Sequence, residues 1–331
     1  MVVILAFLPV LLFLLCLYLL DSFKLVTVRL LSVCLLWGVM AAGFSYLLNT
    51  GLADAMGADE STLSRYIAPV VEELLKLLLL FALVAKKRIG FMIDAAIYGF
   101  AIGTGFALAE NTWYYLQLGA DFHIILAAVR GLGTALMHGG VVAVAGIILI
   151  ESVHRSDKTW PGAIAGLLTA IILHSLFNHF LFNPLLQTIL ILIILPVSFQ
   201  LVFTFAGNNL QQWLEVAFSN EVDMLGMMRK GQFKDTKAGR YLASLKDYFS
   251  PETLVDMYCF FSLYLELSIK AKRNMMLKEN GFPVMIEPDI RDKLVEMKTL
   301  RKKIGKSGEM ALSPLVRMRY RDLWQLNQFQ K

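Results

Sequence analysis

Three ionisable residues interrupt an otherwise apolar stretch, VVEELLKLLLL, at residues 70–80. Glu72 and Lys76 are four positions apart and Glu73 and Lys76 are three apart, so both pairs share one helical face. If this stretch crosses a membrane, each charged group that faced lipid would cost about 2.5–3.5 kcal/mol. We therefore expect the three side chains to face a protein interior or a wet cavity, where Lys76 neutralises one carboxylate and the other needs a different partner.

Three later apolar stretches also carry polar residues. FALAENTWYYL contains Glu110 and Asn111, RGLGTALMHGG contains His138, and ILHSLFNHFLF contains His174 and Asn178 four residues apart. One histidine in an apolar helix is usually a satisfied core residue, but acids, histidines and asparagines in four neighbouring segments indicate a shared site. At 1.5 Å per residue, the acids and His174 lie at a similar depth, roughly 10–14 Å below one membrane surface.

These residue types suit the hydrolysis of an amide. Peptide cleavage needs an activated water, a stabiliser for the oxyanion and a proton donor for the leaving amine. We expect Glu73 or Glu72 to activate the water and Lys76 to hold the second carboxylate. His138 and His174 would polarise the carbonyl or stabilise the oxyanion.

Two further roles and a metal alternative follow from the same groups. Asn178 would assist the histidines, and Glu110 with Asn111 would orient a histidine or the water. Glu110, His138 and His174 are also a competent zinc set, with water as the fourth ligand. The compact zinc-protease motif HExxH is absent from the sequence. Zinc dependence therefore stays open.

The elements that carry these groups are predicted to be membrane spans. The chain of 331 residues is 57% hydrophobic, against about 45–50% in soluble domains, and its mean hydropathy is +0.61. The first 20 residues lack a basic start and a small-residue cleavage site, which predicts a retained span and not a signal peptide. We expect an all-α, polytopic bundle of about seven transmembrane helices, near residues 2–20, 25–48, 64–85, 91–117, 124–150, 161–182 and 184–206.

Loop charges predict the orientation of this bundle. Basic residues follow the first, third, fifth and seventh spans, whereas the loop GLADAMGADE is acidic. Lysine and arginine mark the cytoplasmic side of a membrane. The N-terminus is therefore expected outside and the C-terminus in the cytoplasm.

A change in charge divides the chain into two predicted domains. Residues 1–207 carry 10 basic and 11 acidic residues, and residues 208–331 carry 21 and 15. The second part is expected to be a basic, helical cytosolic region. Within it, SPETLVDMYCFFSLYLEL starts with Ser250 as an N-cap and Pro251 at the first helical position, which favours a buried amphipathic helix over an eighth crossing. No nucleic-acid motif occurs, so no nucleic-acid partner is expected.

The polar motifs resemble those of a known family. EELLK resembles the EExxK motif of the PrsW family of intramembrane proteases, FALAEN resembles its FxxxEN motif, and His138 and HSLFN resemble its two histidine motifs. The resemblance covers about residues 60–185. It implies an endopeptidase of the bacterial plasma membrane that cuts a membrane-associated protein, and the family role is site-1 cleavage of an anti-sigma factor.

Two other functions stay open. Relatives of this family include the CAAX prenyl protease, bacteriocin-processing membrane proteases and the scaffold subunit of gamma-secretase, so a non-catalytic membrane scaffold is one alternative. Intramembrane glutamates and histidines also build the proton relays of transporters, although no inverted repeat is evident. The sequence has no GxGD aspartyl motif and no rhomboid-like GxSG motif. The combination of acids and histidines favours the protease.

Overall fold

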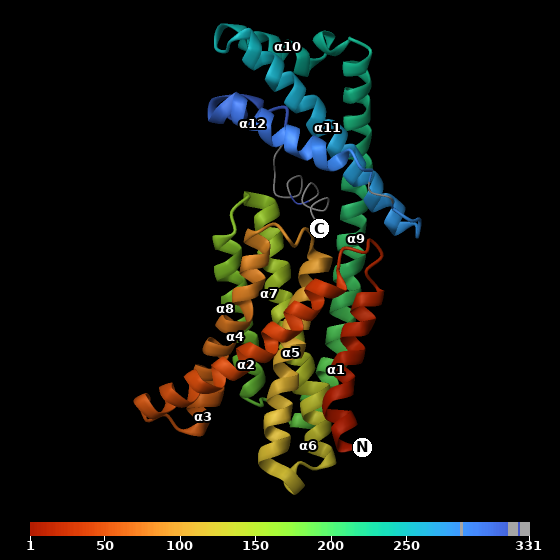
Figure 1. Ribbon diagram of the computed structural model, residues 1–331. Coiled ribbons are helices and arrows are strands. Elements are labelled where there is room, and N and C mark those ends of the chain that lie inside the picture. Colours follow the sequence, from red (N-terminus) through yellow and green to blue (C-terminus); the bar gives the residue numbers. More distant parts are fainter. Residues whose placement is uncertain (285–286, 317–323, 325–331) are drawn as a thin grey trace. The chain divides into compact units, whose positions relative to one another are not determined.

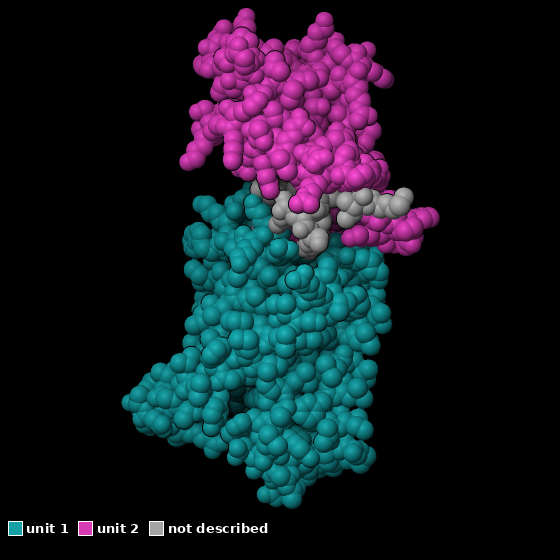
Figure 2. All heavy atoms as spheres, viewed as in Figure 1, with its two compact units in different colours: residues 1–207 teal, residues 208–331 magenta. Residues whose placement is uncertain are grey.

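All regular elements in the described part of the chain are helices, which confirms the all-α prediction (Figure 1). The computed structural model describes residues 1–284, 287–316 and 324. The chain forms two compact units, Met1–Gly207 and Asn208–Lys331, which Figure 2 colours teal and magenta. The boundary lies where the charge of the sequence changes.

The first unit is a helical bundle. Two π-helical segments, η1 and η3, lead directly into α4 and α7, and such segments are rare and frequently occur at functional sites. The elements of this unit are α1 (Val2–Leu19), α2 (Val28–Met56), α3 (Glu60–Thr62), η1 (Leu63–Ile67), α4 (Ala68–Ala85), α5 (Met92–Leu118), η2 (Gly119–Asp121), α6 (Ile124–Ala128), η3 (Val129–Thr134), α7 (Ala135–Ser156), α8 (Trp160–Asn178) and the first part of α9 (Pro184–Arg229).

Several of these helices can cross a membrane. Among the described residues, six stretches are long and apolar enough: α1, α2, α5 with η2, the run from α6 to α7, α8 and α9. The remaining predicted span, near residues 64–85, contains α4, which has 18 residues but carries three ionisable groups and is therefore less apolar than the other six. The chain is accordingly a multi-pass membrane protein.

The helices α5 and α7 form the buried centre of the first unit, because most of their residues are shielded by the other helices. Glycines let the helix backbones approach closely there. A Cβ atom on Gly103 of α5 would lie 2.2 Å from the backbone oxygen of His138 on α7, and one on Gly105 would lie 2.0 Å from the backbone oxygen of Leu35 on α2. This packing fixes the position of His138 along the axis of α5.

Helix α5 begins at a cap made by its own first turn. The carboxylate of Asp94 accepts hydrogen bonds from the backbone N–H groups of Gly90 and Phe91, both at 2.8 Å. These bonds satisfy donors that a helix start otherwise leaves unpaired. Asp94 therefore has a structural role at one end of α5, away from the polar residues at the other end.

The second unit contains the rest of α9, α10 (Lys237–Ser244), α11 (Pro251–Glu279) and α12 (Ile290–Leu312), with the short segments η4 (Phe233–Asp235) and η5 (Leu245–Asp247). Its core gathers apolar side chains of α11 and α12, such as Phe260, Leu267 and Leu294. Helix α11 starts as predicted, because Ser250 accepts a hydrogen bond from the backbone N–H of Thr253. Helix α9 extends beyond the last predicted span, since it continues past residue 206 to Arg229.

Candidate active site

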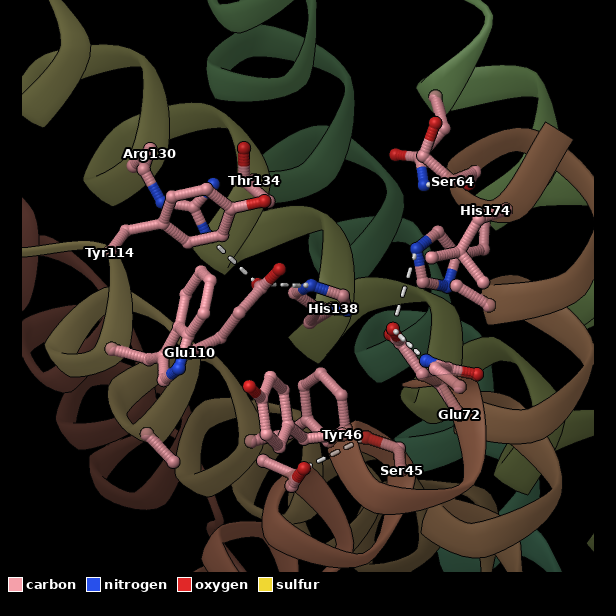
Figure 3. Close-up of a pocket in the computed structure, with 18 of the residues that line it drawn as sticks. Ser45, Tyr46, Ser64, Glu72, Glu110, Tyr114, Arg130, Thr134, His138 and His174 are labelled. Carbon is pink, nitrogen blue, oxygen red and sulfur yellow. Dashed lines mark hydrogen bonds and ion pairs between the residues drawn. The ribbon is translucent and has the colours of Figure 1, made fainter. Parts of the chain in front are cut away.

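A cavity of about 550 Å³ lies in the first unit between α2, η1, α4, α5, η3, α7 and α8 (Figure 3). This volume falls within the usual range of ligand pockets, about 300–1,000 Å³. Side chains from four different segments meet on its wall, as the spacing of the polar motifs predicts. Its charged and titratable lining residues include Glu72, Glu110, Arg130, His138 and His174.

Lys76 pairs with Glu73 beneath the cavity wall. Its Nζ lies 2.5 Å from Glu73 Oε1, and both side chains are fully buried. The same ammonium group contacts Nδ1 of His138 at 3.0 Å and lies over the ring of Phe106 at 4.2 Å. Of the two adjacent acids, Glu73 is therefore the one that the lysine neutralises, and Glu72 needs another partner.

Glu73 also orients His174. Nδ1 of His174 lies 2.6 Å from Glu73 Oε1 and donates its proton to this carboxylate. The other ring nitrogen, Nε2, lies 3.9 Å from Oε2 of Glu72. A hydrogen bond at one ring nitrogen determines the state of the other. His174 therefore presents an unprotonated Nε2 on the side of Glu72.

Glu110 orients the second histidine. Nε2 of His138 donates to Glu110 Oε2 at 3.0 Å, and the same oxygen forms an ion pair with Arg130 at 2.9 Å. Figure 3 shows these three side chains on one side of the cavity, across from Glu72 and His174. The prediction that Glu110 orients a histidine agrees with this geometry.

Arg130 lines the cavity and was not among the predicted site residues. Its guanidinium group packs on the ring of Tyr114 at 3.7 Å, and its Nε donates to Asn111 Oδ1 at 2.9 Å. The available signal was its spacing of eight residues from His138, which places both on one side of a helical segment. Asn111 in turn donates to the backbone oxygen of Ala6 on α1. The predicted role of Asn111, orienting a histidine or a water, does not match these contacts, because its amide holds Arg130.

Asn178 and His179 differ in their relation to the cavity. Asn178 belongs to its lining, and its amide nitrogen donates to the backbone oxygen of Ser64 at 2.8 Å, which ties α8 to η1. His179 contacts the backbone oxygen of Ser175 and the hydroxyl of Tyr66. The proposed assistance of Asn178 to the histidines stays a prediction.

Glu72 is the acid whose charge is least satisfied. Its Oε1 lies 3.5 Å from the amide nitrogen of Asn49, and its buried Oε2 has no hydrogen-bond partner within the described part of the chain. Ligand atoms of Glu72, His138 and His174 lie within 4.8 Å of one another. The predicted metal set had Glu110 in this place. In the structure, Glu110 is paired with Arg130 and the group that could hold a metal contains Glu72.

The charges and donor types of the site fit a metal cation. Three carboxylates stand against two basic side chains, Lys76 and Arg130, so one buried negative charge is left unbalanced. Two imidazoles and a carboxylate form a common catalytic zinc set. A histidine that binds zinc usually donates its other ring N–H to a carboxylate, as His174 does to Glu73. His138, whose two ring nitrogens both have partners, would have to exchange one contact.

The family of the chain follows from a comparison with family models. Residues 27–205, more than half of the chain, match the PrsW family of intramembrane metalloproteases. The chain belongs to the PrsW family. The match contains every PrsW-like motif and all the predicted site residues, and it ends just before the second unit. Comparisons with curated proteins and with solved structures gave no match. Membership of the PrsW family supports an intramembrane protease and agrees with a metal at the group formed by Glu72, His138 and His174.

Proposed function

We propose that the chain is an intramembrane endopeptidase in which Glu72 activates the attacking water. The observation that carries this proposal is the pair formed by Glu72 Oε2 and His174 Nε2, two hydrogen-bond acceptors 3.9 Å apart on the wall of the cavity. A water molecule between them could donate one hydrogen to each, which would orient its lone pair toward a substrate carbonyl. A carboxylate that takes up the proton of this water acts as a general base.

The neighbouring residues would hold this arrangement in place. Glu73 keeps the ring of His174 in one orientation, and Lys76 compensates the charge of Glu73. His138, held by Glu110 and Lys76, would stabilise the developing oxyanion or pass a proton to the leaving amine. Proton transfer and oxyanion stabilisation are the two remaining requirements of amide hydrolysis.

Zinc is the metal that these residues fit best, with Glu72, His138 and His174 as its ligands. When bound, zinc supplies Lewis acidity toward water and the scissile carbonyl. Under this version, Glu73 and Glu110 keep their roles as the carboxylates that orient the two histidines. Glu72 would then be a zinc ligand and not the general base, so the site keeps the same residues while the role of Glu72 changes.

The substrate is proposed to be a membrane-associated protein that is cut near the extracytoplasmic surface. Two residues near the expected outer surface contribute to the cavity lining. Glu60 is the last residue of the acidic loop that is expected outside, and Ser64 follows this loop. This supports an opening toward that side if the N-terminus lies outside the cell and the C-terminus in the cytoplasm. By its family, the substrate class would include an anti-sigma factor of a bacterial plasma membrane.

The test compares membrane proteomes of cells that produce the wild type, Glu72→Gln or Thr50→Ala. Thr50 also lines the cavity, but its hydroxyl donates to its own helix at Tyr46, so this variant is a matched control. We expect a membrane protein to accumulate uncut in the Glu72→Gln cells and to be cut in the other two. Identical cleavage products in all three strains would contradict a protease and favour the scaffold or the proton-coupled transporter.

A further inference from the structure

Asn49 of α2 is a polar residue of the cavity wall that lies outside all the motifs of the family. Its amide nitrogen lies 3.5 Å from Oε1 of Glu72. Its own Oδ1 is buried and has no hydrogen-bond partner in the described residues. Asn49 therefore reaches the proposed base from a neighbouring helix and leaves an acceptor unused beside it.

The two sides of this amide have different chemical characters. The NH2 group of Asn49 is directed toward Glu72 Oε1, and its carbonyl oxygen points elsewhere. The serine and the threonine of α2 in the cavity lining behave differently. The hydroxyl groups of Ser45 and Thr50 donate to the backbone oxygens of Ala42 and Tyr46 on their own helix. Asn49 keeps its polar atoms for partners outside α2.

An unused acceptor at this position suits a peptide ligand. Buried polar atoms in proteins nearly always have a partner, and every residue of a peptide other than proline offers one backbone N–H. Peptides that bind in an extended form are held largely through such main-chain hydrogen bonds. A carbonyl oxygen adjacent to Glu72 would lie beside the backbone of a substrate whose scissile bond approaches the water.

We propose that Asn49 binds the substrate backbone. Oδ1 accepts a hydrogen bond from the N–H of a residue next to the scissile bond, while Nδ2 holds the carboxylate of Glu72. One side chain then links the position of the peptide to the position of the base. This role rests on the proposed peptidase function and adds a substrate-binding residue to it.

The test uses the full-length protein in liposomes and synthetic peptides with one apolar span of about 20 residues. A fluorophore and a quencher flank the segment next to the outer surface. A peptide that the wild type cleaves is then resynthesised with one peptide bond N-methylated at a time around the cut. N-methylation removes one backbone donor, so it reports which N–H groups the enzyme binds.

We expect wild-type kcat/KM to fall roughly 5- to 10-fold when the bound N–H is methylated, as the loss of one hydrogen bond predicts. Asn49→Ala should be slower on the unmodified peptide and should lose nothing more at that same position. Thr50→Ala should reproduce the wild-type pattern. An Asn49→Ala variant that is fully active, or that stays sensitive to methylation at the same position, overturns the proposal.

A second variant guards against a folding defect in Asn49→Ala. Asn49→Asp keeps an acceptor oxygen but lacks the NH2 donor, so we expect the methylation sensitivity to remain while kcat falls. Loss of this sensitivity in Asn49→Asp would refute substrate binding by Oδ1. Other results would contradict the proposed function and not the role of Asn49 alone. These are a wild type that cleaves none of the peptides, or a Glu72→Gln variant that cleaves them as fast as the wild type.

Discussion

Glu72 and Glu73 are neighbours in the sequence but lie in different surroundings. Glu73 is completely buried and shares its Oε1 with Lys76 and His174. Glu72 lines the cavity and keeps an oxygen without a hydrogen-bond partner among the described residues. Burial with two partners suits a residue that holds others in place, whereas a carboxylate of the cavity lining with an unpaired oxygen suits a residue that reacts. The two acids should therefore respond differently to the same substitution.

The first prediction concerns this difference. Glu73→Gln removes the charge opposite Lys76, and breaking a buried ion pair from one side typically costs about 3–5 kcal/mol. We expect a clear loss of thermal stability for Glu73→Gln in detergent, but little change for Glu72→Gln. Among the described residues, Glu72 has only long contacts, to Asn49 at 3.5 Å and to His174 at 3.9 Å. Thermal unfolding of the purified variants measures this. A larger loss for Glu72→Gln than for Glu73→Gln would contradict the assignment of Lys76 to Glu73.

The second prediction concerns the metal. If zinc binds to Glu72, His138 and His174, protein purified without chelators should contain about one zinc ion per chain. His174→Ala should lose most of it, because an imidazole is removed from the ligand set. Asn178→Ala, which also changes the cavity lining, should retain it. Metal analysis provides the result, and a wild type that is fully active when free of metal would end the zinc proposal.

At this scale, the sequence grouped polar residues that lie close together in the structure, but it left their partners undetermined. Spacings of three and four residues both allow Lys76 to reach an acid, so the pattern could not choose between Glu73 and Glu72. The same limit explains why Glu110 was predicted as a metal ligand in place of Glu72. The contacts of Glu110 with Arg130 and of Glu72 with the histidines join different helices. Such pairings depend on helix rotation, which a single sequence leaves undetermined.

The helices position the site through close contacts between their backbones. Gly103 lies against the backbone of His138, so the distance between α5 and α7 depends on the absence of a side chain there. Glu110 on α5 and His138 on α7 meet across the same pair of helices. A change at Gly103 should therefore disturb the site without altering any polar group.

The third prediction tests this dependence. Gly103→Ala would put a Cβ 2.2 Å from the backbone oxygen of His138, which forces the two helices apart. We expect lower thermal stability and reduced cleavage. Gly51→Ala, at an exposed position of α2 with nothing within 4 Å, should instead be neutral or gain up to about 1 kcal/mol from helix propensity. Equal behaviour of the two variants in thermal unfolding would count against the packing argument.

The fourth prediction concerns pH and the second unit. Partial burial alone would raise the pKa of Glu266, but its hydrogen bond to Lys293 and the charge of that residue lower the pKa below its usual value. Hydrogen bonds to Asp289 and Glu266 raise the pKa of Lys293. A lowered carboxyl pKa stabilises the fold above the unfolded value of about 4.3, and this stability is lost as the pH falls through the folded value.

Amide hydrogen exchange along α11 and α12, corrected for its intrinsic pH dependence, measures this effect in the full-length protein. We expect protection to be constant near neutral pH and to decrease below roughly pH 4. Glu266→Gln should have lower protection at neutral pH and a weaker decrease on acidification. Glu296→Gln, an exposed position on α12, is the control and should match the wild type. A decrease of the same size in Glu266→Gln would show that this ion pair is not its source.

Among the elements, hydropathy predicted where the spans lie but not where every helix ends. The apolar run stops near residue 206, whereas α9 continues to Arg229. The residues that follow mix polar and apolar types but contain no proline, so the backbone hydrogen bonds can continue after the apolar run ends. The π-helical segments η1 and η3 also went unpredicted, because no regular residue pattern distinguishes their sequences from those of α-helices.

At the scale of the whole molecule, the two units differ in composition and in their relation to the family. The PrsW match ends at residue 205 and the first compact unit ends at residue 207, so the second unit lies beyond the protease-like part. The sign of the net charge of the sequence also changes at this point. The orientation across the membrane was predicted from loop charges and stays a prediction.

The fifth prediction tests this orientation with a native thiol. Cys259 lies on α11 in the second unit and is exposed. If the C-terminal unit is cytoplasmic, a membrane-impermeant thiol reagent should label Cys259 only after the membrane is opened. Cys259→Ser identifies the labelled residue, since Cys16 is also exposed. Labelling of Cys259 in intact cells would reverse the topology and would place the cavity opening on the cytoplasmic side.

The most direct test of the site is the single-turnover rate at which the wild type and Glu72→Gln cleave one reconstituted single-span peptide, measured at equal amounts of folded protein. A general base contributes about 10²- to 10⁴-fold to such a rate. We expect Glu72→Gln to be slower by a factor in this range, and we expect the wild type to incorporate oxygen from labelled water into the new carboxylate. Equal rates for the two proteins would contradict the role of Glu72.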